Sequence, residues 1–352
     1  MNRVLAVRLD SDGDVLITGP AVRALANTSE QLDLMLSPAG LAAAELLPGV
    51  TDLLVFDAPW TGYAPPAFDG ADVFALVDRL SRRRYSKAVI FTSFHQSPLP
   101  MALLARLAGI PFIAATSVDY PGSLLDLRHQ RPTGHEVEAM LDLAVAAGGK
   151  LPAGDNGYLR IRSLPESIDL QVDHLPAAGS YVVVHPGASV PARGLTPDHA
   201  ASIVAALSAA GWPVAVTGGP AEGDLARHAA GSTGIDLAGR TDLRQLAAIV
   251  ASAACVVVGN TGPAHLAAAV GTPVVSLFAP VVPAERWRPY GVPTVLLGDQ
   301  QQACRDTRAR TCPLPGHPCL SRVSGAEVVA AVKQLVLAPH RADDLPRTAG
   351  AA

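Results

Sequence analysis

Three strand-like runs in the second half of the chain end in glycine-rich turns, and this pattern constrains the fold more than any other feature. The runs are 181–189, 214–222 and 256–265, and each passes from β-branched apolar residues through small residues into a helical stretch. In a parallel sheet such turns lie at the carboxyl edge, where α/β proteins bind ligands. Glycine lets the backbone approach a phosphate, and a helix start offers unpaired N–H groups. The pattern therefore predicts a nucleotide site.

Strand-like and helix-like segments alternate along the whole chain. The predicted strands are 4–9, 33–36, 53–56, 88–92, 112–115, 181–185, 214–217, 256–258, 274–278 and 294–297. Apolar residues at helical spacing occur between and after them, at 21–27, 101–108, 199–209, 243–251, 264–270 and 324–337. Two such sets predict an α/β protein with two doubly wound, Rossmann-like domains and parallel sheets. We place the domains at 1–170 and 171–340, with 341–352 as a flexible tail.

Charge and hydropathy restrict the partners of this chain. The net charge of −4 over 352 residues argues against a general nucleic-acid binder, which is usually basic. The longest apolar stretch, 246–258, is shorter than the roughly 20 residues that a membrane-spanning helix needs. The apolar run 4–7 is too short for a signal peptide. We therefore expect a cytoplasmic protein, and peripheral contact with the inner face of the membrane stays open.

The cysteines do not form a common metal motif. Cys255 falls in a predicted strand, where we expect a small buried apolar residue. Cys304, Cys312 and Cys319 form a C-x7-C-x6-C cluster near His317, without the C-x2-C pair of common zinc sites. We interpret the cluster as a loop that carries thiols, and metal binding by it stays open.

An acidic segment follows the first predicted strand, in Arg8-Leu-Asp-Ser-Asp-Gly-Asp-Val. Asp10, Asp12 and Asp14 are close enough to repel one another, which raises the pKa of some of them unless a cation intervenes. A solvated turn with a helix cap is the structural interpretation. The functional interpretation is a general base, a metal site or a phosphoryl site at the mouth of a cleft.

Taken alone, these acidic residues match the motifs of two enzyme classes. Asp10-x-Asp12-Gly13 resembles the nucleophile motif of haloacid dehalogenase-like phosphatases, in which the first Asp attacks phosphorus and the second is the acid. The distal magnesium pair of that class would have to be Asp299 and Asp306, whose spacing fits badly. Asp10-Ser-Asp12 also matches the D-x-D of metal-dependent glycosyltransferases, which is short and common by chance.

The first two glycine-rich turns offer phosphate-binding and ribose-binding groups. The turn 185–193 offers the hydroxyl of Ser189 and the positive charge of Arg193. The guanidinium of Arg193 can bind a phosphate through two hydrogen bonds. In the turn 217–222, Gly218 allows close approach, and Glu222 is placed to accept from ribose hydroxyls. Plain βα loops with surface charges are the structural alternative.

The third turn is Gly259-Asn-Thr-Gly-Pro-Ala-His265. Thr261 and Gly262 can bind a diphosphate at a helix start, and Pro263 is preset for the first helical turn. His265 would lie one turn in, within reach of a phosphate or a ribose. Neither a Walker A motif nor a G-x-G-x-x-G after a strand occurs, so the ATPase and dinucleotide fingerprints are absent from the sequence.

In this order and spacing, the four motifs resemble the ADP-heptose:lipopolysaccharide heptosyltransferase family, glycosyltransferase family nine. The similarity runs from about residue 3 to 337 and is strongest at 13–15 with Pro20, 185–189, 218–222, 237–243 and 259–273. The resemblance implies a GT-B fold, with two Rossmann-like domains that face each other across a cleft. It also implies an acceptor side in the first domain, a sugar-nucleotide side in the second, and an inverting reaction without an active-site metal.

The resemblance also assigns roles to individual residues. Asp14 matches the catalytic base, and Asp10, Asp12 and Gly13 are weaker substrate-binding candidates. The nucleotide-binding positions are Ser189, Arg193, Gly218, Glu222, Asn260, Thr261, Gly262 and His265. Asn260 departs from the usual Asp, and Leu195 stands where a Trp often follows the cation.

The implied function is transfer of a heptose or related sugar from an ADP-sugar-type donor to a glycolipid, cell-wall glycan or other acceptor hydroxyl. We expect no cofactor, no metal and no nucleic-acid partner, and the sequence does not indicate an oligomeric state. Two other classes stay open. One is a sugar-nucleotide epimerase or hydrolase on the same fold, and the other is a non-catalytic nucleotide-sugar binder.

Overall fold

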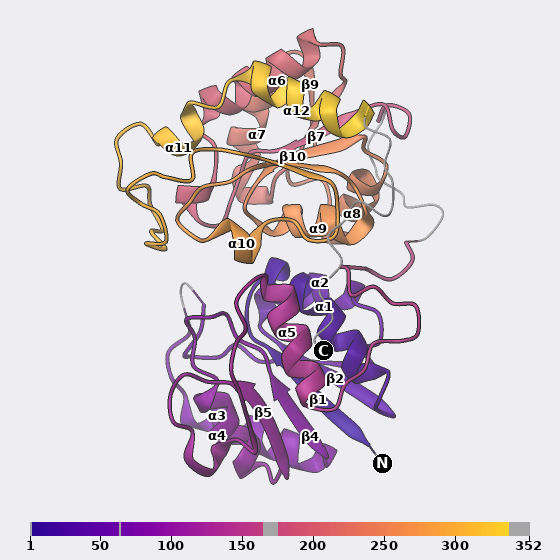
Figure 1. Cartoon of the computed structure of the whole chain (residues 1–352), viewed down its shortest axis with the longest axis vertical. Helices are drawn as coiled ribbons and strands as arrows, with labels where there is room; N and C mark the ends of the chain where they lie inside the picture. Colours follow the sequence, from indigo (N-terminus) through magenta and orange to yellow (C-terminus); the bar gives the residue numbers. More distant parts are fainter. Residues whose placement is uncertain (1, 63–64, 165–174, 338–352) are drawn as a thin grey trace. The chain divides into compact units, whose positions relative to one another are not determined.

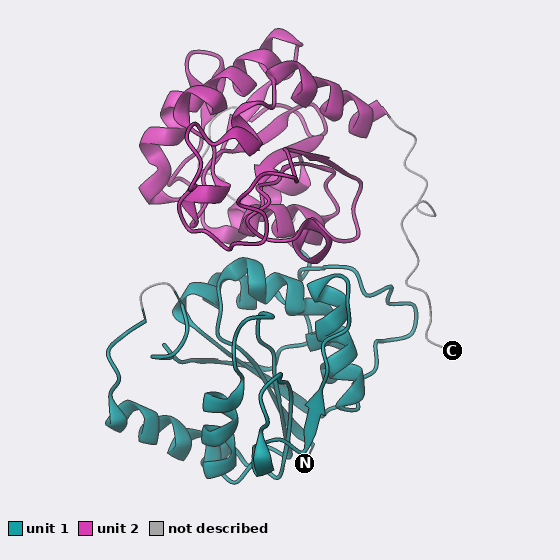
Figure 2. Cartoon of the chain, turned by 60° about the vertical axis from the view of Figure 1, so that its left-hand side comes forward, with its two compact units in different colours: residues 1–163 teal, residues 164–352 magenta. Residues whose placement is uncertain are grey.

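The computed structural model describes residues 2–62, 65–164 and 175–337. The chain divides into two compact units, Met1–Ser163 and Leu164–Ala352, and each contains its own parallel sheet (Figures 1 and 2). The predicted domain boundary at 170 and the predicted tail at 341–352 lie outside the described residues.

The sheet of the first unit has the strand order β3-β2-β1-β4-β5-β6, and all of its pairings are parallel. Its strands are β1 (Arg3–Arg8), β2 (Gln31–Leu36), β3 (Asp52–Val55), β4 (Lys87–Ile90), β5 (Phe112–Thr116) and β6 (Leu127–His129). The chain builds outward from β1 to β3 and then returns to β4 on the other side. The strand order therefore reverses between β1 and β4, and such a switch point opens a ligand-binding crevice at the carboxyl ends of the strands.

Helices cover both faces of this sheet (Figure 1). They are α1 (Asp12–Ala26), α2 (Leu41–Leu46), α3 (Gly70–Arg83), α4 (Leu99–Leu107) and α5 (Glu136–Ala146), with short 3-10 turns η1 (Pro38–Gly40) and η2 (Gly122–Leu124). Helix α1 is buried over most of its length and packs against α5. On the other face, α3 and α4 cover a core that includes Leu5, Leu54 and Ile90. Both faces of the strands are thus apolar, as the continuous hydrophobic runs predicted.

The sheet of the second unit repeats this plan in the order β12-β11-β10-β7-β8-β9, again with parallel pairings. Its strands are β7 (Val182–His185), β8 (Val214–Val216), β9 (Gly234–Asp236), β10 (Cys255–Gly259), β11 (Val274–Leu277) and β12 (Thr294–Leu297). Its switch point lies between β7 and β10. Two of the three glycine-rich turns follow these two strands, so they meet at the predicted ligand-binding edge.

The helices of the second unit are α6 (Pro197–Ala209), α7 (Gly223–Ala230), α8 (Leu243–Ala251), α9 (Gly262–Val270), α10 (Ala284–Trp287), α11 (Pro318–Ser321) and α12 (Gly325–Leu337), with 3-10 turns η3 (Pro191–Arg193) and η4 (Pro220–Glu222). Helices α6 and α12 pack together over a core of valines, leucines and alanines. Cys255 is buried in β10, which confirms its predicted structural role. Cys304 and Cys319 are buried in the same core.

The predicted strands are all present, but two short edge strands, β6 and β9, were not predicted. Each pairs with a single neighbour, and their sequences, Leu-Arg-His and Gly-Ile-Asp, lack an apolar run. The start of α1 was also placed too late. The helix begins at Asp12 after an extended Ser11, so Asp12 and Asp14 lie in its first turn and not in a loop. Acidic residues stabilise that position because they face the positive end of the helix dipole.

Among the residues that the structure describes, none of the helices has both the length and the apolar character that a membrane-spanning helix needs.

Candidate functional site

The acidic segment of the first unit is organised around Arg8, the last residue of β1, whose side chain is fully buried. Its Nε lies 3.0 Å from Asp10 Oδ2, and its Nη2 donates to Asp14 Oδ1 at 2.7 Å. The other oxygen of Asp14 accepts a hydrogen bond from Ser11 Oγ at 3.0 Å. Burial alone lowers the pKa of Arg8, but the neighbouring carboxylates outweigh burial and raise it. Arg8 is therefore the cation that compensates the closely spaced carboxylates.

A loop after β4 completes this cluster from across the switch point. Arg8 Nη2 also donates to Ser93 Oγ at 3.0 Å, and Gln96 Nε2 donates to Asp10 Oδ1 at 2.6 Å. Burial raises the pKa of Asp10, and the positive charge of Arg8 opposes this shift. The side chains of two separate strand ends thus form one polar network at the carboxyl edge of the sheet.

Asp12 has a different role from its two acidic neighbours. Its Oδ1 accepts from the Ala43 backbone N–H at 2.9 Å, so it fastens the start of α2 to α1. Burial raises the pKa of Asp12. Gly13 is buried inside α1. Because Asp12 is used by a backbone amide, the phosphatase interpretation loses support for its acid residue.

Asp14 has the features that a general base requires. Its side chain is 22% exposed, against 11% for Asp10. Asp14 lies in the first turn of α1, next to the guanidinium of Arg8. The two hydrogen bonds from Arg8 and Ser11 fix its orientation. A carboxylate that is oriented and partly exposed can accept a proton from a bound hydroxyl.

Sequence reasoning missed several residues of this cluster. Besides Arg8, Ser93 and Gln96, a second ion pair lies behind it, in which Arg131 Nη1 donates to the buried Glu136 at 2.5 Å. Arg131 also donates to the Thr92 backbone oxygen at 2.8 Å. For Ser93 and Gln96 the available signal was positional, because 93–96 directly follows the predicted strand 88–92 and therefore lies at the same sheet edge as the acidic segment.

In the second unit, Glu222 joins the turns after β7 and β8. Its Oε2 accepts from the Gly219 N–H at 2.7 Å, and its carboxylate lies against Gly187, where an added Cβ would be 2.0 Å from Oε1. His185 Nε2 is 3.7 Å from Glu222, and His185 Nδ1 is 3.0 Å from Thr217 Oγ1. Burial lowers the pKa of His185, and Glu222 opposes this shift. Only glycine at 187 leaves room for the carboxylate.

Asn260 is tied to the protein backbone. It is buried, its Nδ2 donates to the Ala279 carbonyl at 3.4 Å, and its Oδ1 accepts from the Ala279 N–H at 3.3 Å. This reciprocal pair fastens the end of β10 to the segment after β11. An amide can make both bonds, whereas a carboxylate can make only the second. The two bonds to Ala279 give a structural reason for Asn in place of the usual Asp at position 260. The contact of Asn260 with a nucleotide stays a prediction. Leu195, the other departure, is buried in the core.

The start of α9 has no side-chain cap among the described residues. Thr261 is the extended N-cap residue, and Pro263 lies in the first turn. The residues 261–263 are all half-buried. Pro263 has no N–H, and the N–H groups of Thr261 and Ala264 donate to the oxygens of Gly259 and Thr261 at 2.9 and 3.0 Å. Among the described residues of this turn, the Gly262 N–H is therefore the donor that stays available to an anion. Gly259 lies against the Arg193 backbone, since an added Cβ would be 2.5 Å from the Arg193 oxygen. The first and third turns thus meet at the switch point.

The remaining predicted nucleotide residues are distributed around this edge. Ser189 is exposed in the turn after β7, and Gly218 is half-buried in the turn after β8. His265 is buried within the first turns of α9. Within the described residues, no group of three or more His, Cys, Asp or Glu side chains is arranged to hold a metal ion.

Comparison with known proteins identifies the family. Residues 73–317 match the family model described as glycosyltransferase family 9 (heptosyltransferase). Lipopolysaccharide heptosyltransferase 3 of Escherichia coli is 31% identical over 175 residues, which are 47% of this chain and 50% of that protein. The chain thus spans about half the length of this curated relative. The family match covers most of the chain, which therefore belongs to glycosyltransferase family 9.

Solved structures agree on the fold. A family 9 glycosyl transferase from Veillonella parvula superposes with a TM-score of 0.76 at 17% identity, over 96% of this chain and 97% of that one. The E. coli ADP-heptose lipopolysaccharide heptosyltransferase II superposes with a TM-score of 0.73 at 20% identity, over 95% and 98%. The predicted fold class, GT-B with two Rossmann-like domains and parallel sheets, is thereby confirmed.

Proposed function

We propose that this protein is an inverting, metal-independent glycosyltransferase that moves a heptose or related sugar from an ADP-sugar to an acceptor hydroxyl. The observation that carries the proposal is the state of Asp14, an accessible carboxylate held by a buried arginine at a switch point. The uncapped start of α9 at the switch point of the second sheet supports a diphosphate partner. The family membership supports sugar transfer, and the name of the E. coli heptosyltransferase II supports ADP-heptose as the donor.

In the proposed reaction, Asp14 removes the proton from the acceptor hydroxyl as its oxygen attacks the anomeric carbon of the donor. The bond from that carbon to the diphosphate oxygen breaks with its electron pair, so ADP leaves and the anomeric configuration inverts. Arg8 and Ser11 hold the carboxylate in one orientation before the acceptor arrives. Such preorganisation avoids a reorganisation cost during the chemical step.

The leaving diphosphate gains negative charge as the bond breaks. The Gly262 amide, the positive end of the α9 dipole and the guanidinium of Arg193 would stabilise this charge, in place of a metal ion. Removing one such donor typically costs about 3 kcal/mol of transition-state stabilisation. Glu222 would accept from the ribose hydroxyls, in the position that Gly187 and the Gly219 amide define.

The acceptor and compartment belong to the same proposal. The curated relative is named a lipopolysaccharide heptosyltransferase, which supports a glycolipid or other cell-envelope glycan as acceptor. A cytoplasmic enzyme that works at the inner face of the membrane would meet both such an acceptor and an ADP-sugar.

The Asp14→Asn variant tests the proposal. An amide cannot take up the proton, so sugar transfer from ADP-heptose should be lost, while ADP affinity measured by calorimetry should stay at the wild-type value. Turnover that persists in this variant would remove Asp14 as the base.

Wild-type activity should also survive EDTA, because the proposed mechanism uses no metal ion. Activity that EDTA abolishes and magnesium restores would favour a metal-dependent mechanism.

Product analysis with and without acceptor separates the alternatives. Conversion of the donor without acceptor would indicate an epimerase or hydrolase, and ADP binding without any product would indicate a non-catalytic binder.

A further inference from the structure

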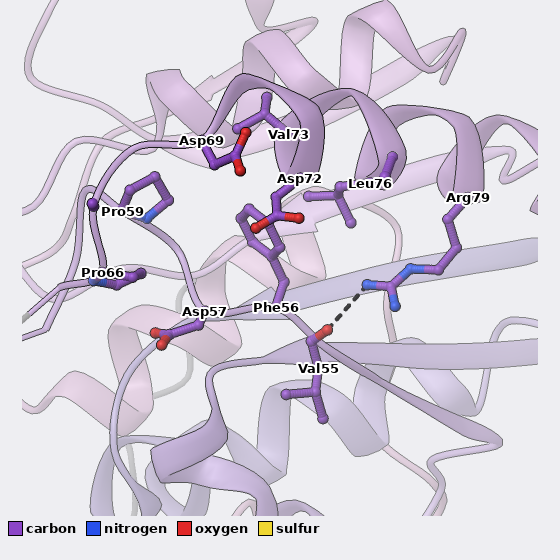
Figure 3. Close-up of a pocket in the computed structure, with 12 residues that line it drawn as sticks. Val55, Phe56, Asp57, Pro59, Pro66, Asp69, Asp72, Val73, Leu76 and Arg79 are labelled. Atoms are coloured by element: carbon purple, nitrogen blue, oxygen red, sulfur yellow. Dashed lines mark hydrogen bonds between the residues drawn. The ribbon is translucent and has the colours of Figure 1, made fainter.

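A cavity of about 480 Å³ lies at the carboxyl end of β3 in the first unit (Figure 3). Its lining comes from the segment after β3 and from α3. The lining residues are Val55, Phe56, Asp57, Pro59, Pro66, Ala67, Asp69, Asp72, Val73, Ala75, Leu76 and Arg79. Its volume falls in the range of small-molecule sites, ~300–1,000 Å³. Phe56 packs against the core of the unit and against Trp60, with ring centroids 5.8 Å apart, so one wall is anchored.

The segment that lines this cavity is linked to the Asp14 cluster. Gln96 Nε2, which donates to Asp10 Oδ1, also lies 3.3 Å from the hydroxyl of Thr61, in the same loop as Pro59. Asp10 in turn pairs with Arg8, which holds Asp14. The cavity and the proposed base thus lie on the same carboxyl edge of one sheet, and the side chains of Gln96, Asp10 and Arg8 link the loop at Thr61 to Asp14.

The charge of the lining indicates the chemistry of the ligand. Asp57, Asp69 and Asp72 are exposed carboxylates, and Arg79 is the one cationic lining residue, with its Nη2 donating to the Val55 oxygen at 3.0 Å (Figure 3). Asp69 caps α3 by accepting from the Ala71 N–H. Within the described residues, neither Asp57 nor Asp72 has a hydrogen-bond or ion-pair partner. The excess of negative charge repels phosphate and carboxylate groups and attracts cations and hydroxyl donors.

A metal ion does not fit this cavity, since no three of its carboxylates are grouped as metal ligands in the described part of the chain. A protonated amine fits better. It needs one or two carboxylates without fixed coordination geometry, and it is also attracted by an aromatic face such as that of Phe56. The apolar surface of the partly buried Val73 suits the C–H groups of a sugar ring.

We propose that this cavity is an acceptor subsite that binds a sugar unit carrying a protonated amino group and discriminates against phosphorylated sugars. The proposal rests on the transferase function, because it makes the bound sugar part of the acceptor. It adds a substrate class to that function, since it predicts an acceptor without phosphate at this position.

The test measures sugar binding to the full-length protein by calorimetry or saturation-transfer NMR. The probes are methyl glucosaminide, methyl glucoside and glucose 6-phosphate. The amine should bind most tightly and the phosphate most weakly. The double variant Asp57→Asn/Asp72→Asn should weaken amine binding about five- to tenfold and leave glucoside binding unchanged. Salt at 0.5 M should weaken binding of the amine alone, because it screens exposed charges.

A matched variant controls for overall charge. Asp78→Asn/Asp119→Asn removes two exposed carboxylates of the same unit that do not line the cavity, and it should leave amine binding unchanged. The proposal is overturned if glucose 6-phosphate binds more tightly than the amine, if the cavity variant has wild-type affinity, or if the control variant weakens binding equally. These readouts involve neither ADP nor turnover. A wild-type protein that fails to transfer sugar would contradict the proposed function, but the measured sugar affinities would still test the cavity proposal.

Discussion

At the residue scale, the missing side chain of Gly187 and the amide of Asn260 decide the shape of the proposed nucleotide site. Glu222 can hold its position only because residue 187 has no Cβ, and Asn260 can hold Ala279 only because an amide both donates and accepts. The residue types of Gly187 and Asn260 do not by themselves indicate these roles. Each matters because of a neighbour that is distant in the sequence.

Gly187→Ala should therefore weaken ADP binding. The new methyl group would displace the Glu222 carboxylate from the Gly219 amide, and losing a charged hydrogen bond to the ribose costs about tenfold or more in affinity. Calorimetric titration with ADP measures this loss. Gly219→Ala is the matched control, since its Cβ would lie 3.7 Å from Glu222 and its φ of −68° suits alanine. Equal ADP affinity in the two variants would contradict the assigned role of Glu222.

Asn260→Ala should lower the free energy of unfolding by about 1–3 kcal/mol, because it leaves the buried N–H and C=O of Ala279 without partners. Chemical denaturation of wild type and variant measures this difference. A variant with unchanged stability and lost ADP affinity would show that Asn260 acts as a nucleotide ligand instead.

At the scale of elements, α1 organises the first unit. Its N-terminal turn carries Asp14, and its last turns hold the segment that leads toward the second unit. Arg23 donates to both oxygens of Asp155 at 2.7 and 2.9 Å and to the Tyr158 backbone oxygen at 2.8 Å. The side chains of this pair are only 7% and 5% exposed. A buried pair of this kind is costly to break because the remaining charge loses its partner.

Asp155→Asn should lower the free energy of unfolding by about 3 kcal/mol at pH 7. The hydrogen bonds from Arg23 hold the pKa of Asp155 below its ordinary value of 3.8. The contribution of this carboxylate is therefore present above pH 3.8 and is lost as the pH falls through the lower pKa of the folded state. The difference between wild type and variant, measured by urea denaturation, should shrink as the pH falls below this value.

Asp224→Asn is the control for this prediction, because the Arg227–Asp224 pair is fully on the surface and should contribute nothing measurable. If Asp155→Asn were as neutral as this control, the Arg23 pair would not fasten the segment.

At the scale of the whole molecule, the two proposed tasks fall in different units. The proposed base and the acceptor cavity belong to Met1–Ser163, and the proposed nucleotide residues all belong to Leu164–Ala352. Each unit has its own sheet and its own buried core. Such units can fold alone in principle.

A fragment of residues 164–352 should therefore bind ADP and catalyse no transfer. Circular dichroism checks that it is folded, and calorimetry measures its ADP affinity. A folded fragment without ADP affinity would mean that the first unit supplies essential nucleotide contacts.

Local sequence patterns predicted most of the fold and a smaller share of the site. The β-branched runs located every strand except two, because burial in a doubly wound sheet imposes that pattern on each strand separately. The two missed strands are β6 and β9, whose edge positions demand few apolar residues. The helical periodicities located α1, α4, α6, α8, α9 and α12, but gave no range for α3 or α5. They also placed the start of α1 too late, because Asp12 and Gly13 are weak helix formers that become favourable only in a first turn.

The sequence by itself determined the α/β class, the carboxyl-edge placement of the turns and the family resemblance, since each follows from short-range order along the chain. Only the tertiary structure showed which partners hold each of the three carboxylates. Arg8 reaches Ser93, Asp12 reaches Ala43 and Asn260 reaches Ala279, across separations that no local pattern records. The physical reason is that a parallel sheet gathers distant strand ends at one edge, where burial forces their polar groups to find one another.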